Sequence, residues 1–206
     1  MTDFLTMATR ITNELRRSNL LPETKNAIND AIAEAAKDRF WFNEFEGMTF
    51  DTVTNQALYP DLGITEIDTM YILEANGYRR YIDLIDQGTI ELYLDGTQQI
   101  GMPDLFYRRA ETIRLYPVPS QVWTIGIDGY GKLSPWPLVE DTDTNAWMTQ
   151  GERYIRALAK AFLFKDVIRD FGQATAYEAM AEDYKDALTK DTTLRLSSGQ
   201  LRSHSI

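Results

Sequence analysis

The chain has 206 residues, of which 44% are apolar, and this suits one domain of ordinary size or a core with one inserted subdomain. Cysteine is absent and the single histidine, His204, lies among the last residues, so disulfides, zinc sites and Ser-His-Asp catalysis are excluded or nearly so. The formal net charge of −10 argues against a general DNA-binding surface, because phosphate affinity comes mainly from lysine and arginine.

No apolar run approaches the ~18–20 residues that a membrane helix needs. The first residues also lack the charged and apolar regions of a signal peptide. We therefore expect a soluble protein with no membrane segment, made in the cytoplasm.

Two helices are predicted at the start of the chain. Apolar residues recur at three- and four-residue spacing from Asp3 to Asn19, and they indicate a helix with one buried face. Pro22 suits the opening position of a second helix, where its missing N–H costs nothing, and the apolar stripe then runs to about Phe40. A helical hairpin is expected.

Four aromatic residues follow closely where this hairpin ends: Phe40, Trp41, Phe42 and Phe45. This density is too high for a solvated loop and suits side chains that fix helix ends on a neighbouring layer. Core packing is the first interpretation, and an exposed contact between subunits is the alternative.

From Gly47 to about Leu138 the pattern changes to short strands and turns. Asn76-Gly77 predicts a tight type I′ hairpin turn. The segment from Gly101 to Pro119 predicts a pair of strands at the centre of a small β-domain, stopped by prolines. Gln121 to Gly131 predicts another strand, although its glycine-rich end from Gly126 is better explained by a turn.

Two further helices are predicted after an acidic connector. The stretch from Tyr154 to Ile168 is apolar on most of its circumference, so we expect it to be the central core helix. A last helix runs from about Tyr177 to Lys190. Its outer face is acidic, with Glu178, Glu182, Asp183 and Asp186.

The residues after Asp191 form a polar segment without acidic side chains, so its charge contrasts with that of the body. One interpretation is a frayed terminus. The other is a tail that becomes ordered on a partner; its candidate contact residues are Leu194, Arg195, Leu196, Leu201 and Arg202.

No pair of acidic residues has a spacing that argues for acid–base catalysis or metal binding. Asp141 and Asp143 resemble a fragment of a calcium loop, but the required glycine and closing glutamate are missing. Tyr107, Arg108 and Arg114 lie in a basic and aromatic stretch of the kind that stacks single-stranded nucleic acid, yet the acidic chain favours ion pairs there. We expect no cofactor and no metal.

Several short motifs, taken in order, resemble the head-to-tail adaptors of tailed bacteriophages, a group that includes head-completion and tubular tail proteins. They are Arg39-Phe-Trp-Phe-Asn-Glu44, Gly101-Met-Pro103 before an aromatic strand, Ile113-Arg-Leu-Tyr-Pro-Val-Pro119, and Trp147 before the long apolar helix. The similarity extends from about Phe4 to Leu188.

This resemblance implies an α+β fold in which N- and C-terminal helices form a bundle with an inserted antiparallel β-domain. With the residue pattern, it places the bundle at 1–46 and 147–191, the β-domain at 47–146 and an extended tail at 192–206. It also implies a structural protein of the virion neck or tail with no catalytic site, assembled as a ring, usually twelve-fold, between the portal protein and the next tail, nozzle or stopper protein.

Two roles within such a ring follow from the charges. The residues after Asp191 are a candidate portal-docking segment, and the acidic face at 178–186 is a candidate channel lining that lets DNA pass without binding it sequence-specifically. Two alternatives stay open: a carbohydrate-binding β module of a phage or bacterial surface protein, because the β region is rich in tryptophan and tyrosine, and a divalent-cation enzyme that uses scattered carboxylates.

Overall fold

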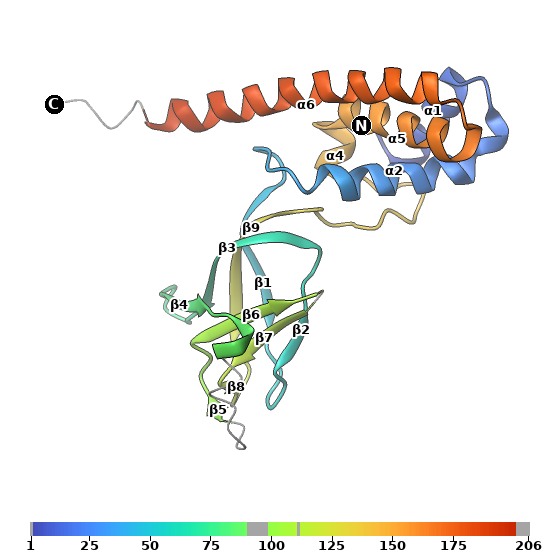
Figure 1. Cartoon of the computed structure of the whole chain (residues 1–206). Coiled ribbons are helices and arrows are strands. Elements are labelled where there is room, and N and C mark those ends of the chain that lie inside the picture. Colours follow the sequence, from blue (N-terminus) through green and yellow to red (C-terminus); the bar gives the residue numbers. More distant parts are fainter. Residues whose placement is uncertain (1, 90–98, 111, 201–206) are drawn as a thin grey trace. The chain divides into compact units, whose positions relative to one another are not determined.

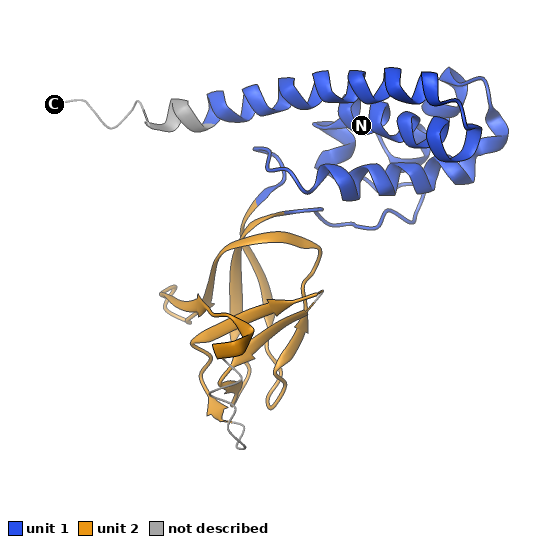
Figure 2. Cartoon of the chain, viewed as in Figure 1, with its two compact units in different colours: residues 1–44, 131–206 blue, residues 45–130 orange. Residues whose placement is uncertain are grey.

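The computed structural model describes residues 2–89, 99–110 and 112–200, and for 196–200 it describes the backbone only. It contains helices and a mixed β-sheet, so the predicted α+β class is confirmed (Figure 1). The chain divides into two compact units, residues 1–44 with 131–206 (unit 1) and residues 45–130 (unit 2), shown in Figure 2. No helix in the described ranges is long and apolar enough to cross a membrane.

Unit 1 is helical. It consists of α1 (Phe4–Glu14), the short η1 (Ser18–Leu20), α2 (Leu21–Ala35), α4 (Ala146–Thr149), α5 (Glu152–Phe162), the π-helical turn η2 (Leu163–Ile168) and α6 (Phe171–Gln200). The first two helices are shorter than expected. The chain turns after Glu14 through Arg16, which has a φ of 55°, and the backbone after Ala35 forms the turns that carry the aromatic residues.

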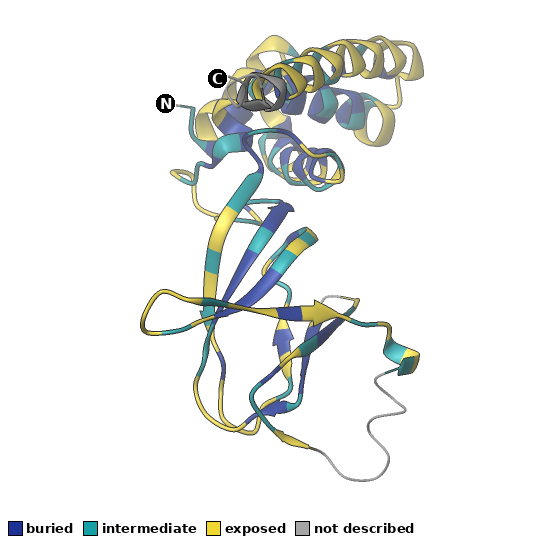
Figure 3. Cartoon of the chain, turned by 90° about the vertical axis from the view of Figure 1, so that its left-hand side faces the viewer, coloured by how far each residue is buried: buried dark blue, intermediate teal, exposed yellow. Residues whose placement is uncertain are grey.

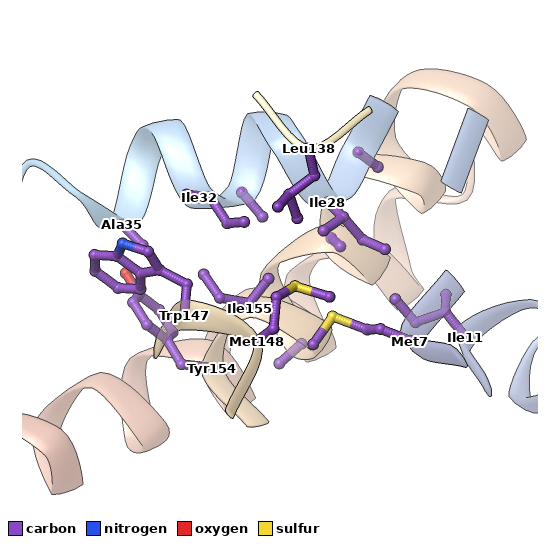
Figure 4. Packing of buried hydrophobic residues seen from close by; sticks show 14 of the residues in the cluster. Met7, Ile11, Ile28, Ile32, Ala35, Leu138, Trp147, Met148, Tyr154 and Ile155 are labelled. Atoms are coloured by element: carbon purple, nitrogen blue, oxygen red, sulfur yellow. The ribbon is translucent and has the colours of Figure 1, made fainter. Parts of the chain in front are cut away.

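The core of unit 1 is built from small and branched side chains on helices far apart in the sequence. Ile28 and Ile32 of α2 face Ile155 of α5, and Trp147 of α4 closes one end of the cluster (Figure 4). Alanines on α2 and α5 let these helices approach closely. The prediction of a central helix is confirmed, because α5 contacts α1, α2, α4 and α6.

Residues 131–145 belong to unit 1, whereas the sequence pattern placed the return to the helical part at residue 147. Leu138 is buried in the helical core, and its backbone N–H and C=O bond to the side-chain amide of Asn29 at 2.9 and 3.0 Å. The backbone N–H groups of Phe4 and Leu5 donate to the carbonyls of Asp143 and Asp141. These contacts join residues more than a hundred positions apart, which a local pattern does not reveal.

The end of unit 1 differs from the expected extended tail, because α6 continues as a helix to Gln200. An ion pair between Arg195 and Asp191, at 3.0 Å and four residues apart, supports the extra turns, and the Thr192 and Thr193 hydroxyls donate to carbonyls four residues earlier. The break before α6 lies at Arg169, with a φ of 61°, and Asp170 caps the helix by accepting from the Gln173 N–H at 3.1 Å.

Unit 2 is a mixed sheet with the strand order β1-β9-β3-β4-β6-β7-β2, accompanied by the pair β5-β8. The bounds are β1 (Glu44–Asp51), β2 (Leu58–Pro60), β3 (Ile64–Leu73), β4 (Arg79–Leu84), β5 (Ile100–Gly101), β6 (Leu105–Arg109), β7 (Thr112–Tyr116), β8 (Val118–Pro119) and β9 (Thr124–Gly131). The sequence pattern also allows a short helix from Asp86 to Leu94; residues 87–89 are helical, Asp86 is not, and 90–94 lie outside the described residues.

The strand directions correct the expectation of an antiparallel domain. β3–β4, β6–β7 and β2–β7 are antiparallel as expected, but β4–β6 and β5–β8 are parallel. The predicted hairpin at Asn76-Gly77 joins β3 and β4, but it is not a type I′ turn, because only Gly77 has a positive φ, at 83°. The Asn76 side chain instead accepts from the Tyr78 N–H at 2.8 Å, as Asn often does in turns.

The glycine-rich segment from Gly126 is part of strand β9 and not a turn. A Cβ atom at Gly129 would lie 2.2 Å from the backbone carbonyl oxygen of Glu66, and one at Gly126 would lie 2.3 Å from the ring of Tyr71. Glycine therefore permits β9 to pack closely on neighbouring residues of β3. The alternation of buried and exposed strand residues is visible in Figure 3.

Candidate assembly surfaces

The aromatic residues after α2 are mainly core residues. Phe40 is fully buried and Phe42 is 7% exposed. Their ring centroids lie 5.9 and 5.0 Å from that of Trp147, in edge-to-face arrangements that add to the burial of the rings. Phe45 is half-buried and packs against the separate core of unit 2. The core interpretation is therefore confirmed for Phe40 and Phe42, which are not available as an exposed subunit contact.

Trp41 connects this segment to the far end of α6. The guanidinium carbon of Arg195 lies 3.8 Å from the centroid of the Trp41 ring, a cation–π contact. The Trp41 backbone N–H donates to the hydroxyl of Thr192 at 3.2 Å, and Thr192 is buried. We call these contacts of Trp41 with Thr192 and Arg195 the α6 clamp. They fix α6 about twenty residues after its start against the segment that leads into unit 2.

The candidate tail residues are thus placed on or after a helix. Leu194 is 68% exposed, and Arg195 is engaged by both Trp41 and Asp191. Leu196 lies within α6, but its side chain is not described, and Leu201 and Arg202 lie outside the described residues. Leu194 is therefore exposed on a helix that is held by Thr192, two residues earlier, and by Arg195, the next residue.

The four candidate channel residues share the solvent-facing side of α6. All are exposed: Glu178, Glu182, Asp183 and Asp186. The side of α6 that packs on the helical core carries Ala174 and Ala181 instead. The carboxylate of Glu178 lies 3.6 Å from the ammonium of Lys165, on η2. Between Ala174 and Asp186 the helix thus turns its two buried alanines to the core and these four carboxylates to solvent.

Acidic side chains on and near α6 shift the pKa of two neighbouring groups. Burial, followed by the charges of Asp38, Glu182 and Glu34, raises the pKa of Tyr154 above its ordinary value. A hydrogen bond to Asp38, at 2.7 Å, raises the pKa of Lys185 and ties α6 to the end of the helical hairpin. Tyr154 and Lys185 therefore keep their protons at neutral pH, which suits a structural role better than proton transfer.

A second charged network joins α1 to α5. Glu14 accepts a hydrogen bond from Lys160 and lies 3.8 Å from Arg156, while Glu152 pairs with Arg10 at 2.7 Å and with Arg156 at 3.2 Å. Burial opposes the ionised form of Glu14, but the hydrogen bond and charge of Lys160 and the nearby arginines outweigh it. The pKa of Glu14 is therefore lowered.

The acidic and basic motifs considered for chemistry have structural partners. Asp143 accepts from the N–H groups of Val139 and Glu140, at 2.7 and 2.8 Å, and Asp141 pairs with Lys25. Over the residues that the structure describes, no three His, Cys, Asp or Glu side chains lie together as a metal site.

The basic and aromatic residues around β6 and β7 also have partners within the fold. The guanidinium of Arg108 lies 2.6 Å from the carboxylate of Asp61 and donates to the Thr65 carbonyl at 2.6 Å. Tyr107 and Tyr116 are buried. Because stacking on nucleic acid needs exposed rings, this stretch is not a platform for single strands, and the ion-pair interpretation is confirmed for Arg108.

The model of the SU10 adaptor protein family matches residues 2–203, nearly the whole chain. A search of the curated proteins found no match.

Proposed function

The chain belongs to the SU10 adaptor protein family, which consists of structural adaptors of phages, and on this premise we propose that it is a head-to-tail adaptor of the virion. In this proposal the protein assembles as a ring of twelve copies beneath the portal, joins the DNA-filled head to the tail and forms part of the channel through which the genome leaves. Unit 1 is its helical bundle and unit 2 its inserted β-domain. The observation that carries the proposal is the family match over residues 2–203.

The side-chain arrangement agrees with a structural role. The charged groups that lie close together, such as Glu14 with Lys160 and Asp61 with Arg108, join elements of the fold. A ring subunit needs two different surfaces for its own copies and further surfaces for the proteins above and below, because a ring closes through heterologous contacts. Two compact units with separate cores supply such surfaces in one chain.

Binding to the portal is the direct test. We expect the purified protein, mixed with purified portal rings of the same phage, to sediment with them and to add a ring of density in electron micrographs. Capsid protein from the same phage is the control. Absence of a complex at micromolar concentrations of both proteins contradicts the proposal.

The segment 192–206 is the proposed portal-docking segment, with Leu194, Arg195, Leu196, Leu201 and Arg202 as its candidate contacts; of these, Leu194 is 68% exposed. Two truncations separate docking from stability. Removal of residues 192–206 also removes the α6 clamp, whereas removal of residues 196–206 keeps Thr192 and Arg195 on Trp41. Loss of portal co-sedimentation with both truncations supports the assignment, and unchanged binding of both contradicts it.

The acidic outer face of α6 is the proposed channel lining. Like charge there keeps the passing DNA from binding the wall. We expect Glu182→Lys with Asp186→Lys to slow genome release from otherwise complete particles, measured by dye entry into ejected DNA. Glu23→Lys with Asp30→Lys on α2 is the matched control, since these residues are also acidic, exposed and helical. Equal release from both double variants contradicts a channel position for α6.

A further inference from the structure

The turn between β3 and β4 carries a pair of residues with chemistry of its own. Asn76 is the only asparagine of the chain that glycine follows. Asparagine is a thermolabile residue, because the backbone nitrogen of the next residue can attack its side-chain amide carbon. Glycine has no Cβ, so it leaves that nitrogen unshielded. The pair Asn76-Gly77 is therefore a candidate for a spontaneous reaction of the chain with itself.

The surroundings of the pair leave room for this reaction. Asn76 and Gly77 are both exposed, so water reaches them. A Cβ atom built at Gly77 would meet no other atom within 4 Å, which means that no neighbouring group crowds the glycine. Gly77 has a φ of 83°, a backbone conformation that other residues rarely adopt. The turn itself therefore favours glycine at the position where the reaction needs it.

Hydrogen bonds of the turn hold the reacting groups in the folded protein. The Gly77 N–H donates to the Glu74 carbonyl at 2.8 Å, and the Tyr78 N–H donates to Oδ1 of Asn76 at 2.8 Å. The Glu74 N–H donates to the Tyr78 carbonyl at 2.9 Å and closes the turn. The first two bonds must open before the Gly77 nitrogen can reach the amide carbon. Exposed turns of this kind open by local fluctuation, without global unfolding.

We propose that Asn76 is a site of spontaneous deamidation in the folded protein. The Gly77 nitrogen loses its proton and forms a bond to Cγ of Asn76, and the bond between Cγ and Nδ2 breaks as ammonia leaves. Water then opens the resulting cyclic imide at either of its two carbonyls. One product is an aspartate, and the other is an isoaspartate, in which the main chain runs through Cγ. Water is the only co-reactant.

The modification acts on the hairpin that the turn closes. Oε2 of Glu74 lies 3.5 Å from Nδ2 of Asn76, so a carboxylate in place of the amide faces a group of like charge. The isoaspartate also adds one atom to the backbone of the turn. Loop length fixes the register of a hairpin, and here the ladder begins with Leu73 opposite Arg79. Deamidation therefore loosens the end of the β3–β4 pair, and it does so irreversibly.

Ageing of the purified full-length protein in mildly alkaline buffer tests the proposal, with peptide mass spectrometry as the readout. Asn55 is the matched internal control, since it is exposed and lies in a turn of the same unit but precedes Gln56. We expect Asn76 to convert about tenfold faster than Asn55, because glutamine shields its own backbone nitrogen. Asn76→Gln should not convert, because the longer side chain closes the ring slowly. Labelling by an isoaspartyl methyltransferase identifies the isoaspartate.

The same samples test the effect on the hairpin. Amide hydrogen exchange should be faster at 71–73 and 79–81 in the isoaspartyl fraction. Asn76→Asp separates the two causes, because it adds the charge without the extra backbone atom and its carboxylate can still accept from the Tyr78 N–H. We expect a smaller change in that variant.

Three results would overturn the inference. The first is a folded protein that stays intact while the same protein in urea converts, because the turn then protects the pair. The second is conversion of Asn55 as fast as that of Asn76, because the glycine then has no special role. The third is an isoaspartyl fraction that exchanges like the original protein, which overturns the effect on the hairpin.

Discussion

The two units of the protein differ in how completely they bury apolar side chains and in how many ion pairs they form. Unit 1 covers its apolar residues with helices and joins those helices by ion pairs, such as Glu14 with Lys160 and Asp38 with Lys185. Unit 2 has fewer ion pairs in the part of the chain that the structure describes, and it leaves more of its apolar side chains exposed, including Leu84 and Ile100. Among the described residues, unit 1 is therefore the more completely packed of the two units.

The largest effect should come from the core of unit 1. Trp147 is fully buried between Phe40 and Phe42, and Trp147→Ala should lower the free energy of unfolding by about 3–5 kcal/mol through lost burial and the cavity left behind. Hydrogen exchange read by mass spectrometry separates the units, and faster exchange is expected in α2 and α5 but not in β6 and β7. Equal acceleration in both units would show that they unfold together. Val139→Ala, at an exposed site, is the control.

Unit 2 should be most sensitive at a glycine. A methyl group at Gly129 meets a backbone oxygen at 2.2 Å that has no side-chain freedom to move away, so Gly129→Ala should cost about 1–3 kcal/mol. The exchange protection of β3 and β9 should fall while that of unit 1 is kept. Gly172→Ala, in α6, is the control, because its new Cβ would make an ordinary 3.5 Å contact with Asp170. A Gly129→Ala protein as stable as the original would contradict the close approach.

The α6 clamp should have a smaller and local effect. Arg195→Gln removes the cation–π contact with Trp41 and the pair with Asp191, and about 1 kcal/mol of local stability should be lost. Faster amide exchange is expected in the last described turns of α6, with the turns around Ala181 unchanged. Lys190→Gln, which alters an exposed cation of the same helix, should leave exchange as it was. Identical exchange in both variants would show that the clamp does not hold the helix end.

The smallest effect should be the pH dependence contributed by Glu14. Its pKa in the folded protein lies below the ordinary value of 4.5, so the unfolded chain binds the proton more tightly. The stabilisation is present above pH 4.5 and is lost as the pH falls through the folded pKa. Because the side chain is 35% exposed, we expect less than ~1 kcal/mol. Urea titrations between pH 3 and 6 should show a shallower pH slope for Glu14→Gln than for the original protein.

The sequence allowed most helices and strands to be predicted, because their patterns are local. The apolar stripe of α1 and the Asn76-Gly77 hairpin needed only a few adjacent residues. The parallel pairing of β4 with β6 depends on how the chain returns to the sheet, and propensities do not encode that path. The glycines of β9 looked like turn residues because the close approach of Tyr71 and Glu66 is not visible in one segment.

The candidate surfaces were predicted less completely. The acidic face of α6 followed from helical spacing and is exposed, as expected for a polar face. The α6 clamp joins Trp41 to Arg195 across more than 150 positions, and no local pattern pairs them.

The chain leaves unit 1 and returns to it at neighbouring positions. β1 and β9 are adjacent strands of the sheet, and near this point the Gly131 N–H donates to the Asn43 carbonyl at 3.1 Å. Because its two ends lie close together, the segment 45–130 can be exchanged, enlarged or replaced by a short hairpin. The helical part keeps its own connections in each case.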